Sequence, residues 1–138
     1  MKGAINTMVN IQKNAALAIG IVFLLIGILG FIPALTPGGA LLGIFMVHGL
    51  HNIVHLLFGV LGIAAALLGA GRLYNRAVGI IYLLLAVLGF IPALVPNGTL
   101  LGLVMINLAD NILHLVIGAA LAYIGFALQS RRAAVQNA

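Results

Sequence analysis

Four long apolar runs, separated by short turn-forming segments, constrain this chain of 138 residues more than any other feature. Each run is at or above the ~20 residues that a helix needs to cross a bilayer. Only helices and closed barrels satisfy the backbone in lipid, and no run alternates polar and apolar residues as a barrel strand does. We therefore predict an all-α, integral membrane four-helix bundle with spans at about residues 15–35, 42–68, 74–94 and 101–128.

The composition excludes a soluble domain. Apolar residues make up 64% of the chain and charged residues only 5%, against about a quarter charged in soluble domains. The spans leave no room for a second folded domain. We expect an N-terminal segment at 1–14, a bundle at 15–128 and a C-terminal tail at 129–138. The chain has no cysteine, which excludes disulfides and thiolate-bound metals.

Basic residues occupy only one side of the expected bundle. They precede the first span, join the second to the third and follow the fourth: Lys2, Lys13, Arg72, Arg76, Arg131 and Arg132. The loops at about 33–41 and 92–100 contain no Lys or Arg. This distribution follows the positive-inside rule and predicts cytoplasmic N- and C-termini. We expect the net charge of +5 to meet the lipid bilayer rather than nucleic acid.

The chain contains an internal repeat. Residues 16–68 align with 75–127 without a gap, and the match includes GFIPAL at 30–35 and 89–94. Each unit is a helical hairpin, so we expect two parallel, non-inverted repeats related by a pseudo-two-fold axis along the membrane normal. Pro33 and Pro92 predict the turns, and the glycines within the spans predict close helix packing or homo-oligomer faces.

The repeat also places a polar stripe on two apolar helices. All four histidines and the only acidic residue of the chain lie in it: His48, His51, Asn52 and His55, matched by Asn107, Asp110, Asn111 and His114. The spacing i, i+3, i+4, i+7 puts each set on one helix face, and the pseudo-symmetry turns the two faces toward each other. Ionisable groups in hydrocarbon are costly, so the stripe is a candidate functional site.

The first interpretation of the stripe is a transition-metal site. The pairs His51/His55 and Asp110/His114 have the i, i+4 spacing that puts two ligands on one helix face. Three imidazoles and one carboxylate suit Zn, Fe, Mn or Co. The remaining polar residues of the stripe would then orient the ligands from a surrounding shell: His48, Asn52, Asn107 and Asn111.

Three other interpretations stay open. His55 and His114 are candidate axial ligands of a haem, or one of them of a chlorophyll magnesium, in a subunit of a larger redox or photosynthetic membrane complex. The stripe is also consistent with a hydrogen-bonded network that clamps the helices, and with a proton or cation path that ends near mid-membrane. No nucleophile or dedicated general base stands out, so we expect a binding or accessory protein rather than an enzyme.

The residues also resemble a known family. GFIPAL, a short Pro/Gly turn and LLGIFMVHGLHNIVHLLFGVLG look like an uncharacterised family of small bacterial four-helix membrane proteins with an HNxxHL motif. The motif is His51–Leu56 here, and aspartate replaces its leading histidine in the second repeat at Asp110. The resemblance covers about 16–126 and implies four spans and a bacterial inner-membrane location. It implies no substrate.

Overall fold

The apolar runs form helices, as expected. The computed structural model describes residues 1–128, with residues 4–9 as backbone only. Within these residues it has four long helices, and the last continues as a π-helix, η5: α1 Lys2–Leu29, α2 Gly49–Leu67, α3 Gly71–Gly89, α4 Leu108–Ala122 and η5 Tyr123–Ala127. All four are long and apolar enough to cross a membrane, which confirms the predicted all-α membrane bundle. The C-terminal tail predicted at 129–138 lies outside the described residues.

The helix ends differ from the predicted spans. α1 and α3 end at Leu29 and Gly89, before the predicted ends at 35 and 94. The reason is the proline that follows, since Pro33 holds Ile32 extended at φ −94°, ψ 108°. At the other end, α1 begins at Lys2, so 1–14 belongs to a continuous helix instead of a separate element.

The two turns contain short strands that the sequence did not predict. In the first turn, β1 Ala40–Leu41 pairs with β2 Phe45–Met46, and in the second, β3 Thr99–Leu100 pairs with β4 Val104–Met105. A pair of 3-10 turns precedes each hairpin: η1 Pro33–Leu35 and η2 Pro37–Gly39, then η3 Pro92–Leu94 and η4 Pro96–Gly98. Residues 42–44 link β1 to β2, and Leu42 and Gly43 have φ of 54° and 73°, positive values that allow the chain to reverse tightly. Because these segments are rich in apolar residues, their sequence suggested helix rather than strand.

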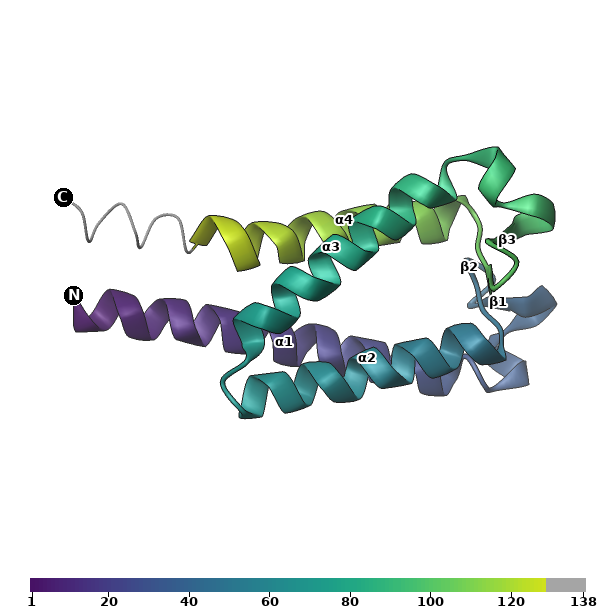
Figure 1. The fold of residues 1–138 in the computed structure, drawn as a ribbon. Helices are drawn as coiled ribbons and strands as arrows, with labels where there is room; N and C mark the ends of the chain where they lie inside the picture. Colours follow the sequence, from purple (N-terminus) through teal and green to yellow (C-terminus); the bar gives the residue numbers. More distant parts are fainter. Residues whose placement is uncertain (129–138) are drawn as a thin grey trace.

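The two helical hairpins run in the same direction. Figure 1 shows both turns at one end of the bundle, and the N-terminus and the end of α4 at the other. The closest packing is within each hairpin, α1 on α2 and α3 on α4, and α1 also packs on α3. Lys13 lies in the first half of α1 and Arg72 in the first turn of α3, so both lie toward the end of the bundle where these helices begin, opposite the turns.

Small residues let the helices approach closely, as the sequence predicted. A Cβ on Gly20 of α1 would lie 2.9 Å from the Ile63 nitrogen of α2, and a Cβ on the equivalent Gly79 would lie 2.6 Å from the Ala122 nitrogen of α4. Such contacts between backbones supply much of the packing energy of helices in lipid. The equivalent glycines therefore make each hairpin a tightly packed unit.

A polar network closes the end of the bundle away from the turns. Gln12 on α1 donates to the Ile124 carbonyl at 2.7 Å, and Asn75 on α3 donates to the Gln12 side-chain oxygen at 2.8 Å. Arg76 Nε donates to the Gly125 carbonyl at 3.0 Å. The wider π-helical turn at η5 changes the backbone bonding there, and side chains from the other helices take up these carbonyls. The network ties α1, α3 and the end of the fourth span together.

Candidate functional site

The polar stripe divides into two layers and a pair of amides. We call His48, Asn107 and Asp110 the turn layer, because they lie where α2 and α4 begin. We call His51, His55 and His114 the histidine layer, because these rings lie further along the same helices. The amides are Asn52 and Asn111, at equivalent positions of the repeat.

In the turn layer, His48 caps α2 and reaches across to the other hairpin. Its Nδ1 accepts from the His51 N–H at 3.1 Å, and its Nε2 lies 3.1 Å from the Leu103 carbonyl. A neutral ring has one donor and one acceptor nitrogen, so the capping contact puts the proton on Nε2, which donates to Leu103. Met105 N also lies 3.1 Å from Nε2. Because Nε2 carries the proton in this tautomer, it has no lone pair with which to accept from Met105 N.

Asn107 and Asp110 mirror this arrangement in the second repeat. They form a capping box: Asp110 N donates to Asn107 Oδ1 at 3.0 Å, and Asn107 N donates to Asp110 Oδ2 at 2.8 Å. Asn107 Nδ2 also donates to the Ile44 carbonyl at 2.7 Å, and Met46 N donates to Asp110 Oδ2 at 3.1 Å. Each turn is therefore held by side chains from the start of the opposite hairpin's second helix.

The two amides pack against the ends of α1 and α3. A Cβ on Gly30 would collide with the Asn52 side chain, and a Cβ on Gly89 would collide with that of Asn111. Asn111 Nδ2 donates to the Gly89 carbonyl at 2.8 Å. Their position over these glycines explains the amides through helix packing. The aligned repeats contained this signal, since glycine and asparagine recur together.

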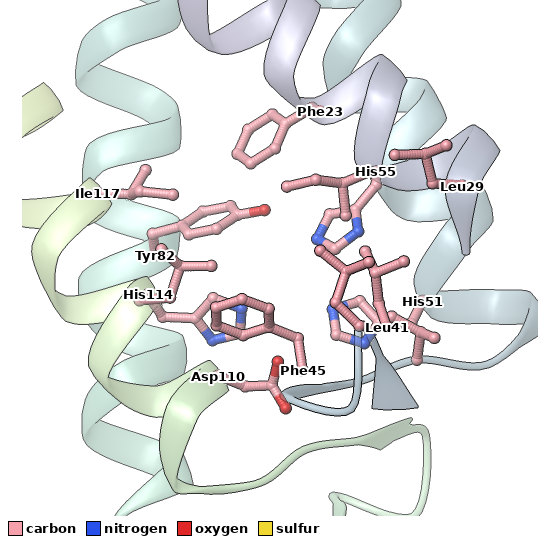
Figure 2. A pocket seen from close by; sticks show the side chains of 14 residues that line it. Phe23, Leu29, Leu41, Phe45, His51, His55, Tyr82, Asp110, His114 and Ile117 are labelled. Carbon is pink, nitrogen blue, oxygen red and sulfur yellow. The ribbon is translucent and has the colours of Figure 1, made fainter. Parts of the chain in front are cut away.

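The histidine layer differs from the turn layer, because its rings are buried and their Nδ1 atoms are not hydrogen-bonded within residues 1–128. Its three rings are 4%, 7% and 5% exposed at His51, His55 and His114. The centre of the His51 ring lies 4.5 Å from that of His55 and 6.3 Å from that of His114. The Nδ1 atom of each ring is buried and has no hydrogen-bond partner among the described residues. Figure 2 shows the three rings around one space at the centre of the bundle.

That space is a cavity of about 160 Å³. Besides the three histidines, its lining includes Asp110, the aromatic rings of Phe23 and Tyr82, and several Leu and Ile side chains. The Phe23 ring stacks on His55 at 5.6 Å, and the Tyr82 ring meets His114 edge-on at 5.0 Å. Figure 2 shows the Tyr82 hydroxyl pointing toward the His55 side of the cavity. Tyr82 was not among the predicted site residues, although the repeat pairs it with Phe23.

A smaller cavity of about 50 Å³ lies on the other side of the histidine layer. Its lining is largely the repeat equivalent of the first, with Leu100 for Leu41, Leu85 for Ile26 and Phe58 for Ile117. The Phe58 ring is larger than the isoleucine it replaces. The histidines therefore separate two related cavities, of which only the one bordered by Ile117 is spacious.

The rings are close enough to share an ion after small rotations. With metal–nitrogen bonds of about 2 Å, two imidazoles on one tetrahedral ion have ring centres roughly 5 Å apart, which lies between the two observed separations. Within residues 1–128, no three His, Cys, Asp or Glu side chains already stand as a ligand set. Asp110 Oδ2 already accepts two backbone bonds, so the three histidines are the less committed donors.

Comparison with known proteins identifies one family. The model of a family described as Domain of unknown function (DUF4383) matches residues 13–127. No curated protein and no solved structure matches the chain.

Proposed function

We propose, for a chain that belongs to the DUF4383 family, that the histidine layer binds a transition-metal ion inside the membrane. His51, His55 and His114 supply three nitrogen ligands, and the second oxygen of Asp110 is a weaker fourth candidate. Three imidazoles suit Zn²⁺, Fe²⁺, Mn²⁺ or Co²⁺ and leave a coordination position open. The protein then acts as a small binding or accessory membrane protein.

One observation supports this proposal above the others. Three buried imidazoles face one cavity, and the Nδ1 atom of each has no partner among the described residues. A buried polar atom without a hydrogen bond costs roughly 1–3 kcal/mol. The side-chain oxygens of Asn52, Asn75 and Asn111 also lack partners in the described part of the chain, but only the three imidazoles line one cavity together, and this convergence weighs against a purely structural role. A metal ion bound through these Nδ1 atoms compensates for the cost of the missing hydrogen bonds with its ligand bonds.

The other interpretations fit the geometry less well. A tetrapyrrole between His55 and His114 needs a pocket of several hundred Å³, in the range of roughly 300–1,000 Å³ for larger ligands. The cavity has about 160 Å³. A clamp accounts for the turn layer, whose members are hydrogen-bonded across the hairpins, but it does not account for the histidine layer. A proton or ion path requires a continuous row of polar partners through the bundle. Between the histidine layer and the network of Gln12 and Asn75, the described core cluster is apolar apart from two tyrosines: Ala16, Phe23, Ala66, Tyr74, Val78, Tyr82 and Leu121.

The location follows from the charge distribution and the resemblance. We propose a bacterial inner-membrane protein with both termini cytoplasmic, because the basic residues within 1–128 collect toward the end of the bundle opposite the turns. The turns then lie near the outer surface, and the histidine layer lies in the outer half of the bilayer. Exposed apolar side chains along all four spans suit lipid, a larger membrane complex or a second copy of the chain.

The metal site is tested by elemental analysis of protein purified in mild detergent. We expect close to one Zn, Fe, Mn or Co per chain, lost in the His55→Ala/His114→Ala double variant. His48→Asn is the matched control, because it changes a histidine of the turn layer and keeps its capping geometry. A wild-type protein without metal after incubation with each of these ions would reject the proposal. A Soret or chlorophyll absorption band would replace it with a tetrapyrrole site.

A further inference from the structure

The larger cavity lies where two helices are loosely joined. α1 packs closely on α2 and α3, whereas α1 and α4 have at most sparse contact along the described residues. Ile26 and Leu29 of α1 and Leu113 and Ile117 of α4 line the cavity from either side of this seam, and all four are only half-buried. The outer faces of both helices expose large apolar side chains. The cavity can therefore be reached sideways from the lipid, between α1 and α4.

The size and lining of the cavity select a class of ligand. A cavity of about 150 Å³ is known to hold one benzene ring, and this one has about 160 Å³. Phe23 and Phe45 offer aromatic contacts along its wall, while the histidine layer and Tyr82 put polar atoms at one end. A single six-membered ring that carries an oxygen matches both parts, because its body is apolar and its oxygen faces the histidines.

A groove on the outside of α4 adjoins this cavity. It has a volume of about 300 Å³, is open to the surroundings and is lined by Phe45, Ala109, Ile112, Leu113 and Val116. Phe45 and Leu113 also line the cavity, so these two side chains form the boundary between the two spaces, and their rotation would join the cavity to the groove. The groove is almost wholly apolar and lies along a membrane span. An apolar tail attached to the ring can lie there while the ring is inside.

We infer that the site takes a membrane-soluble phenol or quinol, with its ring in the cavity, its hydroxyl oxygen toward the histidine layer and its apolar tail in the α4 groove. The inference rests on the proposed function, because the oxygen occupies the coordination position that three imidazoles leave open on the metal. The ligand enters between α1 and α4. The opposite side of the layer does not admit a ring, since Phe58 occupies the place of Ile117 and leaves about 50 Å³.

Cobalt-loaded protein in lipid nanodiscs provides the test, because the visible bands of Co²⁺ change when an oxygen ligand fills an open position. The protein is titrated with 4-octylphenol, with phenol and with octan-1-ol, which has a tail but no ring. We expect the bands to shift with both phenols, with 4-octylphenol the tighter ligand beyond its partition into empty nanodiscs, and to stay unchanged with octan-1-ol.

Three variants locate the ligand. Ile117→Phe copies the residue of the closed side and should weaken 4-octylphenol binding by about tenfold or more, with cobalt stoichiometry unchanged. Ile117→Leu keeps the side-chain volume and should bind as the wild type does. Ala109→Phe fills the groove outside the cavity and should remove the advantage of 4-octylphenol over phenol.

The possible failures are distinguishable. Cobalt that binds with bands unmoved by either phenol would overturn this inference and leave the metal site intact. Equal binding by Ile117→Phe and wild type would overturn the cavity assignment, and equal affinity for phenol and 4-octylphenol would overturn the role of the groove. Cobalt uptake is measured as metal content before any phenol is added. Protein that takes up no cobalt would reject the proposed function.

Discussion

The turn layer and the histidine layer lie on the same helix faces and have very different surroundings. In the turn layer, His48, Asn107 and Asp110 bond to backbone groups of the opposite hairpin and of their own helix starts. In the histidine layer, each Nδ1 atom is buried and unpartnered among the described residues. A polar residue in a membrane helix can thus stabilise or destabilise the fold, depending on whether its polar atoms have hydrogen-bond partners.

The two layers are expected to contribute differently to the free energy of unfolding. A hydrogen bond contributes about 0.5–1.5 kcal/mol, whereas a buried polar group left unpaired costs about 1–3 kcal/mol. The bonds of the turn layer hold two hairpins that otherwise meet through sparse contacts at this end. The Nδ1 atoms of the histidine layer have no such bonds among the described residues, and this is the basis of the proposal that the layer binds a metal ion. Substitutions in the two layers should therefore change the free energy of unfolding in opposite directions.

The largest effect is expected from Asp110→Ala. It removes the acceptor of the Asn107 and Met46 N–H groups and leaves two partly buried donors unpaired. The free energy of unfolding should fall by about 2–4 kcal/mol in detergent-based unfolding of metal-free protein. Asp110→Asn, which retains a side-chain oxygen, is the control and should lose less. An unchanged stability for the alanine variant would remove the distinction between the layers.

A smaller effect of opposite sign is expected from His55→Phe. The phenyl ring removes an unpartnered nitrogen, can still stack on Phe23 and has the adjacent cavity for its extra volume. In chelator-treated protein the free energy of unfolding should stay level or rise by up to about 1 kcal/mol. The same unfolding measurement checks it, and a loss above that size would mean that His55 has a structural role in the metal-free bundle.

The smallest effect is expected from His48→Asn, which copies Asn107 of the other repeat. An amide can accept from His51 N and donate to the Leu103 carbonyl, as the imidazole does. The change in unfolding free energy should stay within about 0.5 kcal/mol, whereas His48→Ala should lose about 1 kcal/mol with the cap. If both variants behave alike, the contacts of His48 do not stabilise the fold.

The sequence predicted the bundle because hydrophobic length and proline breaks act locally. It did not predict the strands at Phe45 and Val104, because their pairing depends on positive φ at Leu42 and Leu101, which apolar composition does not reveal. The helical spacing of the polar residues predicted that they share one face of each helix. The same spacing serves a hydrogen-bonded clamp and a ligand site, so it does not distinguish them. Which groups bond depends on contacts between the hairpins, such as Asn107 with Ile44.

Tyr82 shows a further limit of the sequence. The repeat makes it the counterpart of Phe23, and a tyrosine on an apolar helix usually belongs to the core. Only the crossing of α3 against α4 puts its ring 5.0 Å from His114. A search for aromatic residues that differ in polarity between the repeats would have singled it out.

The unequal halves also have an evolutionary consequence. A dimer of two identical hairpins would carry the same residue at the positions of His51 and Asp110, and the same residue at those of Phe58 and Ile117. Once duplication and fusion had joined the hairpins through the segment Leu68–Ala70, each position could change in one copy alone. In this chain one copy has an acid that docks the hairpins where the other has an imidazole, and one cavity is spacious where Phe58 fills its counterpart. Tandem fusion thus allowed a division of labour that a symmetric ancestor could not have had.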